Sequence, residues 1–234
     1  MTDRPIEPSY VVPPLPRVSV AVRDSTDRFP VHRIYCVGRN YAAHAREMGH
    51  DDREPPFFFQ KNPDDIVEAG KPAPYPPLTA DLHHEVELVV ALAHGGSDIA
   101  AENALSHVYG YAIGLDLTRR DVQAEAKKGG RPWATAKGFA NSAPLGAILP
   151  ATTVGHPAAG KLTATVNGDP RQEGDLSDMI WSVPEIIAHL SRWFVLAPGD
   201  LIFTGTPAGV GELKRGDVVV GAIEGLGQLE VRID

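Results

Sequence analysis

The sequence predicts an α+β fold that is rich in β-structure. Its 234 residues include 21 prolines and 23 glycines, a content that favours many turns and few long helices. Short apolar runs separated by turn residues indicate strands, whereas helix-forming composition is confined to a few segments. This pattern does not fit a dinucleotide-binding fold, and a chain of this length can bury a substantial core within one domain.

The first segments are expected to be irregular or short. Prolines interrupt the start of the chain, and the alternation over residues 17–22 predicts a short strand that leads into a turn. We expect residues 1–31 to form an N-terminal extension that carries this strand. Residues 55–77 are again rich in proline and are expected to form loops around a short aromatic run at 57–59.

Between these segments, residues 40–49 are predicted to form a short helix that ends at Gly49. His44 and Glu47 are three positions apart and would be neighbours on this helix. A glutamate beside an imidazole orients it and raises its basicity, as a general base requires. A surface ion pair has the same spacing, so the pattern alone leaves both interpretations open.

Two carboxylates share one face of a strand predicted over residues 83–92. Side chains at i and i+2 of a strand point to the same side, so Glu85 and Glu87 begin a face that continues as Val89 and Ala91. Like charges that open onto an apolar face repel each other and lose hydration unless a cation or added protons compensate. A hard divalent metal ion bound by oxygen would compensate them. Two solvated glutamates on an edge strand are the alternative.

A third acid lies at the end of the next apolar run. Residues 108–118 are predicted to form a strand that ends near Asp116, and residues 119–128 a helix that stops at Gly129. Functional residues are common where a strand gives way to a helix, although an Asx turn or a helix cap would also place an aspartate there. Three carboxylates from two strands suit Mg²⁺ or Mn²⁺ better than zinc.

The remaining elements lie in the C-terminal part of the chain. Residues 161–166 are predicted to be a strand that enters a hairpin turn at Asn167-Gly168. Residues 181–194 are predicted to form an amphipathic helix with a proline near its start. The tail returns to strands at 217–221 and 229–233.

In the order and spacing of its motifs, the chain resembles the fumarylacetoacetate hydrolase family, and within it the fumarylpyruvate hydrolases. The resemblance implies that residues 32–234 form the mixed β-roll or sandwich of that family's C-terminal catalytic domain, and that the protein is a homodimer. It is carried by the motifs YCVGRNYAAH at 35–44, HEVEL at 84–88, LDLTRRDVQ at 115–123, VNG at 166–168, PGDLIFTGTPAGVG at 198–211 and GLG at 225–227.

The resemblance also implies roles for the acids and for the His44–Glu47 pair. Glu85, Glu87 and Asp116 would hold the Mg²⁺ or Mn²⁺ cofactor. His44, oriented by Glu47, would deprotonate the attacking water.

Further site residues follow from matching motifs. Lys137 would be a catalytic residue that holds or polarises the substrate carbonyl, and Gln123 and Thr206 would contact the substrate. Families of this type frequently carry an aspartate shortly after that lysine, and Ala140 occupies the place here, which leaves the orientation of Lys137 open. Three basic residues could bind a distal carboxylate or form structural salt bridges: Arg39, Lys61 and Arg120.

Composition excludes several functional classes. The net charge of −8 argues against general nucleic-acid binding, which requires a basic face. Cys36 is the only cysteine and lies in an apolar run, so we expect a small buried residue and no intrachain disulfide. The N-terminus lacks the apolar core of a signal peptide and no stretch reaches membrane-spanning length, so a cytoplasmic enzyme is expected.

The chemistry that this resemblance implies is metal-assisted hydrolysis of a small anionic dicarbonyl acid. A 2,4-dioxo acid can chelate one Mg²⁺, and the metal would stabilise the pyruvate enolate that leaves when water cleaves the C–C bond. The expected substrate is fumarylpyruvate, which would yield fumarate and pyruvate in aromatic (gentisate-type) catabolism. An oxaloacetate decarboxylase or a 2-hydroxy-dienedioate isomerase would use the same enolate chemistry without attack by water. A non-catalytic metal-stabilised binding protein would need the three acids but not the pair of His44 and Glu47.

Overall fold

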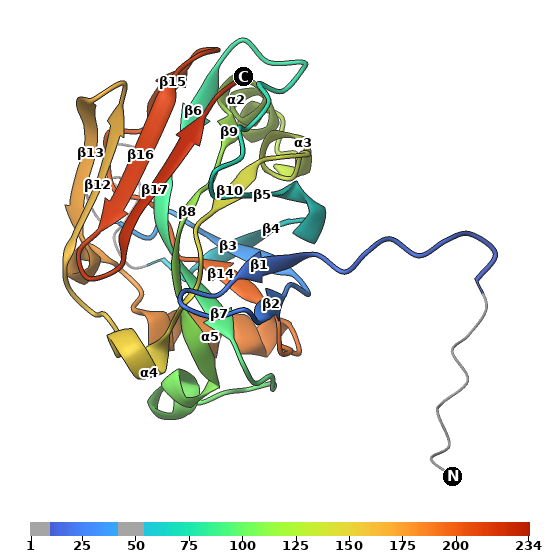
Figure 1. The fold of residues 1–234 in the computed structure, drawn as a ribbon, viewed down its shortest axis with the longest axis vertical. Coiled ribbons are helices and arrows are strands. Elements are labelled where there is room, and N and C mark those ends of the chain that lie inside the picture. Colours follow the sequence, from blue (N-terminus) through green and yellow to red (C-terminus); the bar gives the residue numbers. More distant parts are fainter. Residues whose placement is uncertain (1–9, 42–53) are drawn as a thin grey trace.

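The computed structural model describes residues 10–41 and 54–234. A mixed eight-stranded sheet forms its centre, in the order β4-β3-β14-β7-β8-β10-β5 with β11 paired to β8 (Figure 1). β14 runs parallel to β3 and β10 parallel to β5, whereas the other pairs in this sheet are antiparallel. The bounds are β3 (Ile34–Gly38), β4 (Phe57–Lys61), β5 (Ile66–Glu68), β7 (Val86–Leu92), β8 (Val108–Leu115), β10 (Ala143–Leu145), β11 (Leu149–Pro150) and β14 (Leu201–Phe203).

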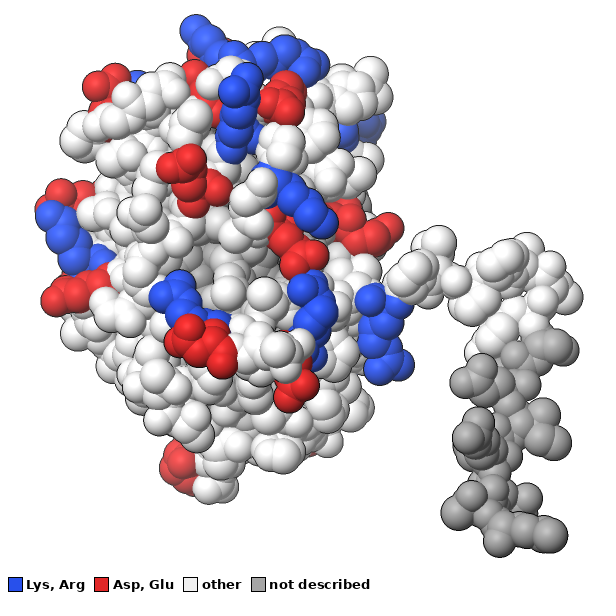
Figure 2. All heavy atoms as spheres, in the orientation of Figure 1, with Lys and Arg blue, Asp and Glu red and all other residues white. Residues whose placement is uncertain are grey.

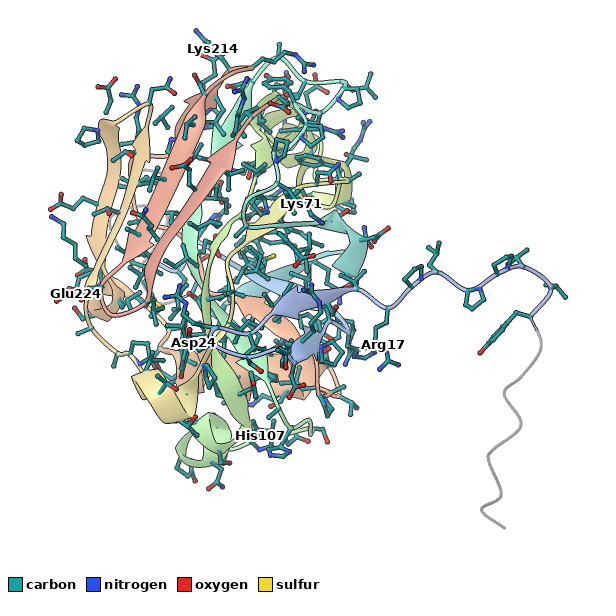
Figure 3. All side chains as sticks on the ribbon, viewed as in Figure 1. Arg17, Asp24, Lys71, His107, Lys214 and Glu224 are labelled. Carbon is teal, nitrogen blue, oxygen red and sulfur yellow. The ribbon has the colours of Figure 1, made fainter. Side chains whose placement is uncertain are left out.

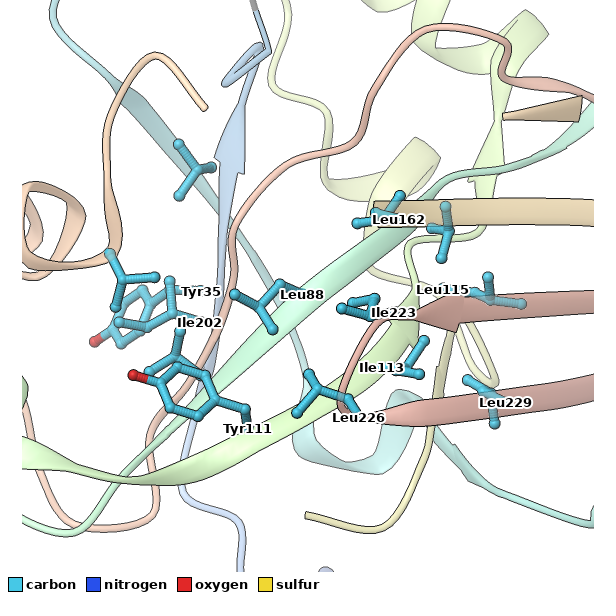
Figure 4. Packing of buried hydrophobic residues seen from close by; sticks show 14 of the residues in the cluster. Tyr35, Leu88, Tyr111, Ile113, Leu115, Leu162, Ile202, Ile223, Leu226 and Leu229 are labelled. Atoms are coloured by element: carbon cyan, nitrogen blue, oxygen red, sulfur yellow. The ribbon is translucent and has the colours of Figure 1, made fainter. Parts of the chain in front are cut away.

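An antiparallel four-stranded sheet, in the order β13-β12-β16-β17, packs against one face of the central sheet. The two sheets approach closely: a Cβ atom on Gly221 of β16 would lie 2.8 Å from Val86 Cγ2. Leucine, isoleucine and valine side chains from both sheets fill the space between them (Figure 4). The strands are β12 (Lys161–Val166), β13 (Asp169–Asp175), β16 (Val218–Ile223) and β17 (Gly227–Arg232).

β7 is buried on both faces and therefore connects two apolar clusters. Leu88 and Val90 belong to the core between the sheets, whereas Val89 and Ala91 belong to a second core. The N-terminal hairpin of β1 (Ser19–Ala21) and β2 (Arg28–Pro30) supplies side chains to that second core. The prediction that Glu87 lies on a face that continues as Val89 and Ala91 is confirmed.

The remaining elements are short and lie around the two sheets. Charged side chains such as Lys214 and Glu224 lie at the edge of the molecule in Figure 3, and on the face in Figure 2 acidic and basic side chains are interspersed. No helix in the described part of the chain is long and apolar enough to cross a membrane. A small sheet contains β15 (Gly211–Leu213), β6 (Leu82–His84) and β9 (Thr118–Arg119). The helices in the described residues are α2 (Arg120–Lys128), α3 (Ala134–Lys137), α4 (Ala151–Val154) and α5 (Val183–Trp193). The 3₁₀ turns there are η1 (Pro63–Asp65), η2 (Ala101–His107) and η3 (Leu176–Asp178).

Most predicted elements are present. The fold is β-rich α+β, and α2 ends at Gly129 as expected. The hairpin turn forms with positive φ at Asn167 (55°) and Gly168 (87°), as a type I′ turn requires. α5 begins with Pro184 in its first turn, and the Ser182 and Glu185 side chains form a capping box.

Two local predictions are wrong. The strand predicted over residues 83–92 is broken at Glu85, because β6 pairs with β15 and β9 whereas β7 pairs with β14 and β8. The chain thus changes sheets at this acid. Residues 57–61 form strand β4 rather than a loop, since they pair along the whole of β3 and the nearby prolines lie outside the paired residues.

Candidate metal centre and active site

Three carboxylates meet where the chain passes from the small sheet to the central one. Glu85 lies between β6 and β7, Glu87 is on β7, and Asp116 follows β8 directly. The backbone N–H of Asp116 donates to the Glu85 carbonyl oxygen at 2.8 Å, so the paired strands fix the two residues side by side. One carboxylate oxygen of each acid lies within 4.8 Å of the others, and all three residues are buried. The structure thus brings together the three acids predicted as metal ligands.

Positive side chains compensate two of these acids. Lys137 Nζ donates to Glu85 Oε2 at 2.8 Å and to Asp116 Oδ2 at 2.6 Å. Arg120 Nη2 donates to Glu85 Oε1 at 2.5 Å. Lys61 Nζ lies 2.9 Å from Asp116 Oδ1. Burial alone would raise the pKa of Glu85, but the charges of Lys137 and Arg120 outweigh burial and lower that pKa below its ordinary value. Glu85 is therefore ionised at neutral pH.

Glu87 differs from its two neighbours because no cation pairs with it within residues 10–41 and 54–234. Its carboxylate accepts a hydrogen bond from the backbone N–H of Gly205 at 2.8 Å. Burial and the negative charges of Asp116 and Glu85 raise the pKa of Glu87 well above its ordinary value. A divalent cation would supply the missing positive charge, and a donor set of carboxylates alone suits Mg²⁺ or Mn²⁺. The residues present therefore fit the metal that the sequence predicts.

Gly205 can donate to Glu87 because it has no side chain. Its φ is +97°, and a Cβ atom there would lie 2.8 Å from Asn40 Cβ. Asn40 in turn donates from its amide to the Thr204 carbonyl oxygen at 2.8 Å. The loop after β14 is thus held against the end of β3, and its backbone amide is directed at the acid cluster.

Gln172 is a buried site residue that the sequence analysis missed. Its Nε2 donates to Thr206 Oγ1 at 2.8 Å, and its Oε1 accepts from the Val86 backbone N–H at 3.1 Å. Thr206 Oγ1 donates to the Val86 carbonyl oxygen at 2.7 Å. These bonds tie β13 and the loop after β14 to the start of β7, between the two glutamates. Its strand neighbours on both sides are exposed, so local sequence did not distinguish this glutamine from a surface residue.

A cavity opens above the acids. Glu85, Glu87 and Lys137 form part of its wall. Arg39, Phe59 and Trp133 line both this cavity and a neighbouring one of about 570 Å³, so the two adjoin each other. The wall of the first cavity also contains four of the predicted substrate contacts: Arg39, Arg120, Gln123 and Thr206. It contains two further residues that the sequence analysis did not single out, Lys127 and Trp133.

Lys61 does not line this cavity. Its ammonium group is buried and donates to the Leu117 carbonyl oxygen at 3.2 Å, to Ser142 Oγ at 3.0 Å and to the Lys137 carbonyl oxygen. The structure thus gives Lys61 the second of its two predicted roles, a structural salt bridge with Asp116. His44 and Glu47 lie outside the described residues.

The fold and the acid cluster together define a class of enzyme. The chain belongs to the fumarylacetoacetate hydrolase family, because the model of the fumarylacetoacetate (FAA) hydrolase C-terminal domain matches residues 33–234. This match confirms the resemblance inferred from the sequence motifs and the fold expected from it. The protein is therefore a metal-dependent enzyme of this family.

Individual relatives carry out different reactions. The fumarylpyruvate hydrolase from Pseudomonas aeruginosa, solved in complex with Mn²⁺ and pyruvate, has a TM-score of 0.93 at 51% identity, over 96% of this chain and 99% of that one. The mitochondrial oxaloacetate tautomerase FAHD1 of Rattus norvegicus is 43% identical over 201 residues, which cover 86% of this chain and 91% of the relative. The 5-carboxymethyl-2-hydroxymuconate delta-isomerase from Mycobacterium smegmatis has a TM-score of 0.79 at 33% identity, over 93% of this chain and 81% of that one. Membership of the family thus leaves hydrolysis, tautomerisation and isomerisation as candidate reactions.

Proposed function

We propose that this protein hydrolyses fumarylpyruvate to fumarate and pyruvate, with Mg²⁺ or Mn²⁺ as its cofactor. The observation that carries the proposal is the acid cluster with its uncompensated Glu87, at the wall of a cavity that Arg39 and Lys127 also line. A substrate with a metal-chelating 2-oxo acid at one end and a carboxylate at the other matches this distribution of charge. The relation to the Pseudomonas aeruginosa hydrolase supports this choice of substrate and metal.

Glu85, Glu87 and Asp116 would hold the metal ion. When bound, the ion supplies a Lewis acid that stabilises negative charge on the pyruvate part of the substrate. Burial alone would lower the pKa of Lys137, but the charges of Asp116 and Glu85 outweigh it and raise that pKa above its ordinary value. Lys137 therefore remains a cation, and it would act as a hydrogen-bond donor rather than as a base.

His44 would take a proton from the attacking water, and Glu47 would orient the imidazole. Water adds to the carbonyl next to the fumaryl group, and Lys137 would stabilise the oxyanion that forms there. The C–C bond to the pyruvate methylene carbon then breaks, and its electron pair leaves as the enolate. Protonation of that carbon gives pyruvate, and the acyl part leaves as fumarate.

A second candidate is enolate chemistry on oxaloacetate without attack by water. The identity of 43% to an oxaloacetate tautomerase favours it, as does the position of Lys137 beside two of the acids. This reaction would use the same metal ligands but would not need a base that deprotonates water.

The deciding experiment compares three substrates on the purified protein with saturating Mg²⁺: fumarylpyruvate, acetylpyruvate and oxaloacetate. We expect release of fumarate and pyruvate, a kcat/KM for fumarylpyruvate at least about ten-fold above that for acetylpyruvate, and no activity after chelation of the metal. Equal kcat/KM for the two acylpyruvates, or turnover of oxaloacetate alone, would contradict the proposal.

A further inference from the structure

Among the described residues, four arginine and lysine side chains line the cavity above the acids: Arg39, Arg120, Lys127 and Lys137. Two of them are committed to protein partners. Lys137 donates to Glu85 and Asp116, and Arg120 donates to Glu85 and, at 2.7 Å, to Gln123 Oε1. These bonds direct both cations at the acid cluster, so carboxylates of the protein already balance their charge.

Lys127 has no such partner. In the described ranges its ammonium group makes no hydrogen bond and no ion pair, and it lies 5.2 Å from the centroid of the Trp133 ring. The side chain is half-buried, so its charge is only partly solvated. A partly desolvated cation that no carboxylate of the protein neutralises is a suitable partner for an anionic ligand.

Helix α2 directs Lys127 at the same space as the residues already assigned to the site. Arg120, Gln123 and Lys127 are at positions i, i+3 and i+7, which lie on one face of a helix, and all three line the cavity. Lys128, the next residue, is exposed and does not line it. The face of α2 that carries Lys127 is therefore the face that borders the substrate.

Trp133 and two phenylalanines form an aromatic wall under the ammonium group. Ring centroids of Phe57 and Phe59 lie 5.2 Å and 5.8 Å from that of Trp133, with edge-to-face geometry. Arg39 lies over the Phe57 ring at 5.3 Å, and its buried Nε has no hydrogen-bond partner among the described residues. Lys127 and Arg39, which have no paired anion in the described part of the chain, thus lie against neighbouring aromatic rings, and such a border suits an unsaturated chain that ends in a carboxylate.

We propose that Lys127, held over Trp133 in the cavity that it shares with Arg39, binds the distal carboxylate of the substrate and sets the preference for dicarboxylic over monocarboxylic 2-oxo acids. This inference deepens the proposed function and rests on it for the identity of the substrate. Lys127 would touch the end of the substrate far from the metal and would take no part in bond cleavage.

The charge of Lys127 is available at neutral pH. Burial and the positive charges of Arg120 and Arg39 lower its pKa to about 8. Most molecules therefore carry the proton at pH 7, and a bound carboxylate would relieve the repulsion among these cations.

The test uses two inert ligands that differ at one end. 2-Oxoheptanedioate and 2-oxoheptanoate share the 2-oxo acid group and the seven-carbon length of fumarylpyruvate, but the second ends in a methyl group. Neither has the 4-oxo group at which water would attack, so their dissociation constants report binding alone. Calorimetric titration of the Mg²⁺-loaded enzyme should show tighter binding of the diacid by about ten- to a hundred-fold, the range of a hydrogen bond between charged groups.

Three variants locate the effect. Lys127→Gln should reduce the preference for the diacid to less than about three-fold and leave the affinity for the monoacid within two-fold of wild type. Lys127→Arg should retain part of the preference, since it keeps the charge. Lys128→Gln is the matched control, and it should prefer the diacid over the monoacid by the same factor as wild type. For catalysis, Lys127→Gln should lower kcat/KM for fumarylpyruvate mainly through KM, and leave acetylpyruvate unaffected.

Each other outcome is decisive. An unchanged ratio in Lys127→Gln, an equal loss of affinity for both ligands, or a wild-type ratio near one would overturn the assignment of Lys127. If the ratio depends on Lys127 but the enzyme does not cleave fumarylpyruvate, the proposed substrate is wrong and the dicarboxylate subsite stands. If fumarylpyruvate is cleaved but the ratio of the diacid and monoacid affinities does not change in Lys127→Gln, the proposed function stands and this inference fails.

Discussion

Replacing Glu87 by glutamine should separate the stability of the metal-free protein from its response to metal. Glutamine keeps the shape of the side chain and its hydrogen bond from Gly205, but it removes the negative charge. In the metal-free protein this charge has no cation beside it, lies near two other acids and is buried. The metal-free Glu87→Gln protein should therefore melt at the same temperature as wild type or above it.

The effect on the metal-loaded protein has the opposite sign. Two unit charges about 4 Å apart attract by ~4 kcal/mol at an effective dielectric constant of ~20, which corresponds to about 1,000-fold in affinity. Because desolvation of the carboxylate offsets part of this attraction, we expect the loss of one ligand charge to weaken metal binding by about 100-fold. At a free metal concentration of about 100 times the wild-type dissociation constant, bound metal stabilises wild type by ~2.7 kcal/mol and the variant by only ~0.4 kcal/mol. For a chain of this size, ~1 kcal/mol shifts Tm by about 2–4 °C, so the shift should fall from about 5–11 °C to about 1–2 °C.

The assay is thermal unfolding of both proteins in chelator and in a series of Mg²⁺ concentrations, with the metal affinity measured by calorimetry. Glu125→Gln provides the control, because Glu125 is an exposed glutamate of α2 that does not line the cavity. If Mg²⁺ raised the Tm of Glu87→Gln by as much as it raises that of wild type, Glu87 would not be a metal ligand. A metal-free variant that melts several degrees below metal-free wild type would refute the argument that this charge is uncompensated.

Two further predictions concern the proton-transfer pair and the distal subsite. His44→Ala should lower kcat for fumarylpyruvate by roughly 10²–10⁴-fold, the range of a positioned general base, while its Mg²⁺ affinity stays at the wild-type value; undiminished hydrolysis would return His44 and Glu47 to a surface ion pair. The preference for 2-oxoheptanedioate over 2-oxoheptanoate should decline as pH rises through about 8, because the pKa of Lys127 is lowered to that value and the protonated form binds the carboxylate. The positive charges of Arg120, Arg39 and Lys137 favour loss of the proton from Lys127, whereas the negative charge of Glu85 opposes it. An affinity ratio that is constant from pH 6.5 to 9.5 would contradict this reading.

Local strand geometry marked the three acids as candidate metal ligands, and the family resemblance favoured the metal site over solvated glutamates and a turn or cap aspartate. Glu85 and Glu87 are two positions apart, and Asp116 ends an apolar run, so periodicity and the strand end identified all three as candidates. The break at Glu85 was not predictable, since it depends on which strands pair with β6 and which with β7. Pairing partners are a tertiary property that the local pattern does not contain.

Side-chain direction explains the other differences. The sequence analysis left Lys61 and Arg39 with the same two possible roles, but Lys61 points from the end of β4 into the protein and Arg39 lines the cavity. Lys127 could have been found from its spacing to Arg120 and Gln123, had it been known which face of α2 borders the cavity. β4 formed against its proline-rich surroundings because pairing with β3 outweighed the local turn signal.

The position of β14 has a consequence for synthesis of the chain. This strand lies between β3 and β7, with Leu201 opposite both Ile34 and Ala91, although it comes late in the sequence. Until residues 201–203 have left the ribosome, β3 and β7 each present an unpaired edge, and such edges favour association with other chains. Contacts of this sequence separation also slow folding, because a long loop must close before they form. The nascent protein therefore passes through a stage in which most of its core residues exist but its central sheet is split, and Glu87 acquires its backbone donor only when that split closes.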